Sequence, residues 1–88
     1  MFIALKYKET NIVEYVLYMW HVEELLRSFN FELEEIKAHV IESFNLSDDA
    51  KVQLTRWYEG LIQDMSDQRI RDRGHLEELN EIISEIQY

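Results

Sequence analysis

Three histidines have a carboxylate one helical turn away, a spacing that places both side chains on the same side of a helix. The pairs are His21 with Glu24, His39 with Glu35 and Glu42, and His75 with Glu78. Metal-binding helical bundles use pairs of this kind, provided that several helices direct them at one point. A metal ion needs three or four converging ligands, and a chain with 18 acidic residues forms isolated pairs by chance. We therefore predict no metal site.

The one basic cluster of the sequence consists of Arg69, Arg71 and Arg73, followed by His75. Arginines in this arrangement could bind a phosphate group or an acidic partner helix. Arginine near the end of a helix also complements the helix dipole, and neighbouring acidic residues neutralise part of the cluster. Because the net charge is −9, the chain as a whole repels nucleic acid. We predict a solvated surface at this cluster and no nucleic-acid partner.

Residues for covalent catalysis are missing from the sequence. There is no cysteine, and no serine follows the glycine-rich turn that exposes a catalytic serine. The sequence also has no glycine-rich loop that could bind a phosphate. Acidic pairs such as Glu23 and Glu24 are adjacent, so on a helix they point about 100° apart and do not share a site. We predict that the protein is not an enzyme and has neither catalytic residues nor a cofactor.

Aromatic residues recur at helical spacing and allow two interpretations. They are Tyr15, Tyr18, Trp20, Trp57 and Tyr58. Such residues usually belong to the core or to a subunit interface, where indole and phenol groups reach a polar rim. The alternative is a small-molecule- or metal-binding bundle with its site between residues 11–29 and 48–72. The residues of that alternative site are Trp20, His21, Glu24, Arg56 and Trp57.

The elements that position these residues are predicted to be helices alone. The chain has no proline and only two glycines, which is too few turn residues for an antiparallel sheet. Asn11 with Glu14 resembles a capping box, and Ser47 is expected to cap another helix. The apolar pattern lapses after Met65, and Gly74 is expected to mark a break or a kink. We predict one all-α domain over 1–88, with an N-terminal arm at 1–9 and helices at 11–29, 32–44, 48–72 and 75–88.

The first predicted helix, 11–29, is apolar or aromatic on every side from Tyr15 to Trp20. A helix of this kind is surrounded by other elements, so we expect a small bundle of three to four helices organised around it. Hydrophobic residues make up 47% of the 88 residues, although a chain of this length buries only a small core. We predict that a homodimer, or an unknown protein partner, covers the surplus. The predicted interface residues are Tyr18, Leu76, Leu79, Ile83 and Ile86.

The sequence also bears on where the protein resides. No apolar run approaches the ~20 residues that span a bilayer, and Met1 to Leu5 is too short for a signal sequence. The lack of cysteine fits a reducing compartment. We expect a soluble, cytoplasmic protein with no membrane partner. Because the apolar stripe continues to the last residues, we also expect the chain to be the first part of a longer protein.

Three segments are distinctive in combination. They are Asn11-Ile12-Val13-Glu14-Tyr15-Val16-Leu17-Tyr18-Met19-Trp20 with Glu24 and Arg27, then Trp57-Tyr58-Glu59-Gly60-Leu61, and finally Gly74-His75-Leu76. Together they resemble an uncharacterised all-helical family of bacterial proteins from the Bacteroidetes lineage, a domain of unknown function. The resemblance covers nearly the whole chain and implies an all-helical fold and a bacterial source. It implies that this chain is the N-terminal half of a protein roughly twice as long, and it supplies no catalytic residues.

Overall fold

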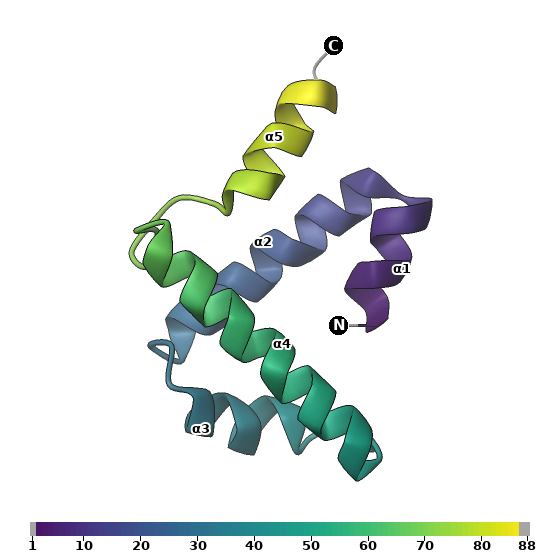
Figure 1. Ribbon diagram of the computed structural model, residues 1–88, viewed down its shortest axis with the longest axis vertical. Coiled ribbons are helices and arrows are strands. Elements are labelled where there is room, and N and C mark those ends of the chain that lie inside the picture. The colour runs from purple at the N-terminus through teal and green to yellow at the C-terminus, as the bar shows by residue number, and fades with distance from the viewer. Residues whose placement is uncertain (1, 87–88) are drawn as a thin grey trace.

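A computed structural model describes residues 2–86, which form helices without any strand (Figure 1). The predicted all-α class is confirmed for this part of the chain. The elements are α1 (Phe2–Thr10), α2 (Ile12–Ser28), α3 (Leu33–Ile36), the π-helical segment η1 (Lys37–Ile41), α4 (Asp48–Asp67) and α5 (Glu77–Ile86). The ends of the predicted arm and of the predicted last helix, Met1 and residues 87–88, lie outside the described residues.

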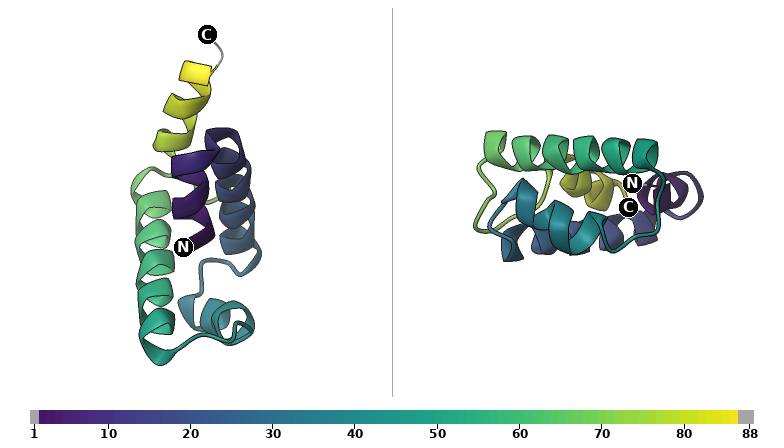
Figure 2. Two further views of the ribbon diagram at one scale, coloured as in Figure 1. Left: turned by 90° about the vertical axis from the view of Figure 1, so that its right-hand side faces the viewer. Right: turned by 90° about the horizontal axis from the view of Figure 1, so that it is seen from below.

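The helices form two layers with the core between them. Helix α4 lies on one side and crosses α2, which lies on the other side together with α3 (Figures 1 and 2). Helix α1 folds back and packs against α2. The core is built from Ala4, Tyr15, Val16, Met19, Val22, Leu26, Ile36, Ile41, Leu54, Tyr58, Leu61, Met65, Leu76 and Leu79. Each helix contributes at least one of these side chains, and α2 and α4 contribute the most.

Both predicted helix caps are confirmed. The side-chain oxygen of Asn11 accepts a hydrogen bond from the backbone N–H of Glu14 at 3.2 Å. The hydroxyl of Ser47 accepts one from the backbone N–H of Ala50, also at 3.2 Å. These oxygens bind N–H groups that have no partner within the first turn of a helix. The starts of α2 and α4 are therefore encoded locally, by the residue that precedes each helix.

The predicted N-terminal arm is a helix instead. The hydroxyl of Thr10 donates to the carbonyl of Lys6 at 2.7 Å in the last turn of α1. Ala4 is 3% exposed in the core, whereas Ile3 and Leu5 are more than half exposed. The apolar pattern of this segment is thus too weak to predict a helix. Packing of Ala4 in the core, which supplies stability that a short isolated helix lacks, decides its conformation.

The second predicted helix contains a π turn, which changes its buried face. The backbone N–H of Glu42 donates to the carbonyl of Lys37, five residues earlier, at 2.9 Å. A π turn brings residues i and i+5 into line, so Ile36 and Ile41 are both buried. Phe44, which the helix predicted over 32–44 includes, lies beyond the end of η1 at Ile41 and is 48% exposed. The predicted helix is therefore too long at its C-terminal end.

Helix α4 ends at Asp67, before the predicted residue 72, in a Schellman motif. The N–H of Ile70 donates to the carbonyl of Met65 and that of Arg69 to the carbonyl of Ser66. Arg69 has a φ of 58°, and Gly74 follows with a φ of 99°. The predicted break at Gly74 is therefore a complete loop over residues 68–76, after which α5 begins.

Two of the five predicted interface residues belong to the core of the chain itself. Leu76 is 7% and Leu79 is 0% exposed, because the start of α5 packs against α2. The prediction that they form a surface between subunits is corrected accordingly. Tyr18 and Ile83 are half-buried, and Tyr18 contacts Tyr7 edge to face with 6.3 Å between the ring centroids. Ile86 is 46% exposed, so of the five it leaves the largest fraction open to solvent.

The prediction that α2 is surrounded holds for only part of its circumference. Val13 and Leu17, one turn apart on α2, are 49% and 47% exposed. Glu23, an acidic residue of the same helix, is 1% exposed. The other helices thus cover α2 on the side of Tyr15, Met19 and Glu23, and they leave the side of Val13 and Leu17 open.

Candidate functional site

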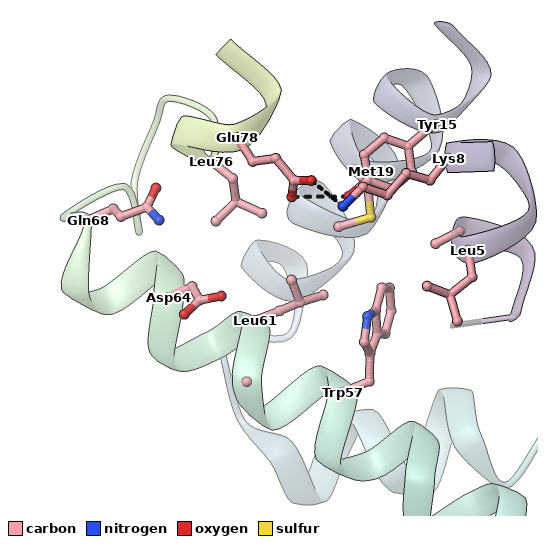
Figure 3. A pocket seen from close by; sticks show the side chains of 12 residues that line it. Leu5, Lys8, Tyr15, Met19, Trp57, Leu61, Asp64, Gln68, Leu76 and Glu78 are labelled. Atoms are coloured by element: carbon pink, nitrogen blue, oxygen red, sulfur yellow. Dashed lines mark hydrogen bonds and ion pairs between the residues drawn. The ribbon is translucent and has the colours of Figure 1, made fainter. Parts of the chain in front are cut away.

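A pocket of about 330 Å³ lies where α1, α2, α4 and the start of α5 meet (Figure 3). It is lined by Ala4, Leu5, Lys8, Tyr15, Met19, Trp57, Gly60, Leu61, Asp64, Gln68, Leu76 and Glu78. Most of the lining residues are apolar or aromatic, and charged or polar side chains come from α1, from α4 and its end, and from α5. This composition is typical of sites for small ligands, which combine an apolar wall with a few polar groups that fix orientation.

Lys8, Tyr15 and Glu78 form the polar side of the pocket. The ammonium nitrogen of Lys8 lies 2.6 Å from a carboxylate oxygen of Glu78 and 5.5 Å from the centre of the Tyr15 ring. The Tyr15 hydroxyl donates to the other oxygen of Glu78 at 3.2 Å. Burial, followed by the charge of Glu78, raises the pKa of Tyr15 to about 12. The phenol therefore stays protonated and remains a donor at neutral pH.

One face of α4 forms the opposite wall. Trp57, Gly60 and Asp64 are spaced three and four residues apart, which aligns them along one side of the helix. The indole of Trp57 and the carboxylate of Asp64 extend from α4 beside the pocket (Figure 3), and Gly60 lies between these two residues in the sequence. A Cβ atom added at Gly60 would have no neighbour within 4 Å. Gly60 is exposed, so this position is open space beside the pocket.

A second group of polar contacts holds the 68–76 loop against α2. The buried carboxylate of Glu23 accepts the backbone N–H of Leu76, and its other oxygen lies 2.7 Å from Nδ1 of His75. The Trp20 ring lies against the His75 ring, with 4.8 Å between centroids. Arg27 donates to the carbonyls of Ile70, Arg71 and Gly74. These contacts join the 68–76 loop to α2.

The predicted pairs of histidine and carboxylate are mostly rearranged. His75 contacts Glu23 and not Glu78, whose carboxylate is held by Lys8 and Tyr15. Glu24 binds Arg27 and Glu42 binds Lys51, while the pair of His39 and Glu35 is present at 3.2 Å. Within residues 2–86, no group of three or more histidine, cysteine, aspartate or glutamate side chains could hold a metal ion. Glu78 and Glu42 bind lysine or tyrosine from other elements, which local spacing does not reveal, whereas the partner of Glu24 is Arg27 on the same helix.

The alternative ligand site of the sequence analysis is divided by the fold. Trp57 lines the pocket between α2 and α4, but Trp20, His21, Glu24 and Arg56 do not. Trp20 lies beside His75, and Arg56 lines a shallower depression that includes Val52. The pocket that the structure has beside α2 and α4 thus has a different set of residues around it.

The basic cluster lies on the loop after α4 and contributes to its packing. The guanidinium of Arg71 lies 4.7 Å from the centre of the Phe31 ring. Phe31 has a φ of 59°, an uncommon conformation for an aromatic residue. The contact joins the α2–α3 connection to the loop, so at least one arginine of the cluster has a structural partner.

The family model described as Domain of unknown function (DUF4924) matches residues 1–88. The chain belongs to this family. No curated protein and no solved structure matches it. The resemblance to a domain of unknown function is thereby confirmed for the whole chain. A Bacteroidetes source and a longer parent protein stay predictions for this DUF4924 domain.

Within the described part of the DUF4924 chain, no helix is long and apolar enough to cross a membrane.

Sequence reasoning missed most of the residues around the pocket. Lys8 and Asp64 were not singled out, and Gly60 was noted only as part of a segment. A signal existed for Glu23, which follows Met19 by four residues and precedes Leu26 by three, on the buried stripe of α2. Gly60 also stands out in the sequence, because glycine in the interior of a helix is destabilising relative to alanine.

Proposed function

We propose that the domain is a binding module without catalytic activity, which associates with a second copy of itself through α5. The amount of exposed surface supports this. The chain exposes 6255 Å², whereas a compact monomer of 10.7 kDa exposes about 5,500 Å². The excess of roughly 700 Å² is close to the ~800 Å² that each partner buries in a typical stable interface.

The apolar face of α5 is the observation that carries the proposal. This face begins in the core at Leu79, 0% exposed, and continues through half-buried Ile83 to Ile86, 46% exposed. Over the same distance the helix leaves the body of the domain and extends beyond it (Figures 1 and 2). An apolar stripe that continues past its own core is suited to a partner helix.

The charges beside this stripe favour a second copy arranged antiparallel. Glu81 and Glu85 lie towards the exposed end of α5 and Glu77 and Glu78 at its start, while the loop before α5 carries Arg71 and Arg73 on either side of Asp72. Around a two-fold axis, antiparallel α5 helices bring the acidic end of each copy beside the basic loop of the other. A parallel pair would place the acidic ends together, which like charges disfavour.

The test is the molar mass in solution, measured by light scattering during size-exclusion chromatography over a range of concentrations. We expect the mass of two chains for the unmodified protein and of one chain for Ile86→Glu. The matched control is Val52→Glu, because Val52 is 49% exposed on α4. This control variant is expected to remain a dimer. Added salt is expected to weaken the dimer by screening the pairing of acidic and basic residues.

A monomer at every concentration would contradict the proposal and leave an unknown protein partner as the explanation of the exposed stripe. A dimer that Ile86→Glu leaves intact would place the interface elsewhere. Val13 and Leu17, on the open side of α2, are then the next surface to test, by Leu17→Glu.

A further inference from the structure

We infer that the pocket between α1, α2, α4 and α5 binds a small organic ammonium ion with an apolar body. This inference does not depend on self-association, because the pocket lies beside the core and not on the exposed end of α5. Its size, about 330 Å³, is at the lower end of the range found for ligand pockets. It suits a ligand with one ring and a short amine.

Gly60 is the first observation. A glycine in the middle of a helix costs about 1 kcal/mol relative to alanine. The usual reasons for keeping one do not apply, since its φ is not positive and no atom of a neighbouring element lies within 4 Å of the Cβ position. Gly60 lines the pocket and is exposed. A side chain at this position would extend into open space beside the pocket.

The charged groups of the pocket indicate the sign of the ligand's charge. Two carboxylates, Asp64 and Glu78, and one ammonium group, that of Lys8, line the pocket. Lys8 is bound to Glu78 at 2.6 Å, whereas Asp64 forms no ion pair within residues 2–86. An added cation is thus attracted by Asp64, and an added anion is repelled. The net charge of −9 attracts cations to the surface as well.

The aromatic groups indicate the form of the cation. The faces of tryptophan and tyrosine attract ammonium groups, and Trp57 and Tyr15 both line the pocket. The pocket already receives one primary ammonium in this way, since that of Lys8 lies over the Tyr15 ring and against a carboxylate. Leu61 and Met19 supply apolar wall for the rest of a ligand. An amine joined to a ring can place its ammonium group against the aromatic faces and its ring against the apolar wall.

The experiment uses phenethylamine as the probe and 3-phenylpropionate as its anionic counterpart, in a titration followed by backbone amide chemical shifts. We expect saturable shifts at Gly60, Leu61 and Asp64 with phenethylamine, at concentrations in the millimolar range typical of ligands this small. We expect binding at least about tenfold weaker for 3-phenylpropionate, because the carboxylate meets Asp64 without a counter-ion.

Two variants separate the site from the fold. Asp64→Asn is expected to weaken phenethylamine binding about tenfold, through loss of the charge attraction. Its matched control is Asp67→Asn, also on α4, where the carboxylate binds Gln63 and does not line the pocket. Gly60→Leu is expected to abolish binding without lowering the melting temperature, because leucine favours the helix and fills open space.

The inference is overturned if phenethylamine and 3-phenylpropionate bind equally well or if phenethylamine causes no chemical-shift change at Gly60. It is also overturned if Asp64→Asn and Asp67→Asn have the same affinity for phenethylamine. The titration is repeated with Ile86→Glu. Binding that this variant retains belongs to the pocket of a single chain, whereas binding that it loses assigns the pocket to a second copy and contradicts the inference.

Discussion

The carboxylate of Glu23, in the middle of α2, accepts a hydrogen bond of 2.7 Å from the backbone N–H of Leu76. The carbonyl of Leu76 accepts the first hydrogen bonds of the last helix, from Leu79 and Asn80. Glu23 therefore caps the start of α5 from another element: it binds the N–H of the residue before the helix, as a Glu or Gln in the first turn does in a capping box. The side-chain oxygen of Gln68 assists by accepting the N–H of Glu77 at 2.9 Å. The start of α5 thus depends on α2 and on the end of α4.

Removing the carboxylate of Glu23 is expected to destabilise the domain strongly. In Glu23→Ala the N–H of Leu76 and the ring of His75 lose a buried, charged partner. Hydrogen bonds to charged groups contribute about 1.5–3 kcal/mol each, so we expect the free energy of unfolding to fall by about 3 kcal/mol. Urea denaturation followed by circular dichroism measures this.

Glu24→Ala is the matched control for this measurement. Glu24 is the next residue of α2, and its carboxylate is largely exposed and pairs with Arg27 at 2.6 Å. Because exposed ion pairs contribute little, we expect a loss below about 1 kcal/mol. Equal losses for the two variants would show that Glu23 does not cap α5.

Two substitutions in the 68–76 loop are expected to change stability in opposite directions, because one introduces a glycine and the other removes one. Arg69 and Gly74 both have positive φ, at 58° and 99°. Arg69→Gly relieves the strain at the helix end and should stabilise by about 0.5–1 kcal/mol. Gly74→Ala introduces that strain and places a Cβ 3.2 Å from a methyl group of Ile70, so it should destabilise by about 1–2 kcal/mol. Thermal unfolding of both variants decides the signs, and a shift in the same direction would contradict the account.

Alkaline pH is expected to destabilise the domain through two buried tyrosines. Burial raises the pKa of Tyr15 and of Tyr58 from 10.0 to about 12. The folded state thus keeps phenolic protons that the unfolded chain releases from pH 10 upward. The stability contributed by the neutral phenols is complete below pH 10 and is lost as the pH rises towards 12. The double variant of Tyr15→Phe with Tyr58→Phe should lose less stability over this interval, as measured by urea denaturation at several pH values. Equal slopes for the variant and the unmodified protein would contradict the assignment.

Local signals in the sequence predicted the helices after residue 11 and the starts of α2 and α4. Asn11 and Ser47 cap their helices with their own side chains, and Gly74 interrupts the chain where its pattern lapses. These features depend on residues a few positions apart, which is why spacing reveals them. Helix α1 depends on Ala4 packing in the core shared with α2, so its own residues did not predict it.

The candidate site was largely beyond sequence reasoning, for a physical reason. Glu78 was paired with His75 by helical spacing, but Lys8 reaches it from another helix. The pocket combines residues from four helices, and Trp57 was the one member of it among the predicted ligand residues. A carboxylate pairs with a cation that the fold brings near it, and this cation can come from another helix, as Lys8 does for Glu78.

The π turn determines whether Val40 or Ile41 is buried in the core, and substitution of each residue tests this. In a regular α-helix, Val40 would follow Ile36 by one turn and lie in the core. The π turn places Ile41 there instead, at 1% exposure, and leaves Val40 half-buried. Ile41→Ala should therefore cost about 3 kcal/mol by leaving a cavity, and Val40→Ala about 1 kcal/mol or less. Both variants have the same helix-favouring replacement, so urea denaturation compares burial directly. A larger loss for Val40→Ala would mean that the segment is a regular helix and that Ile41 lies outside the core.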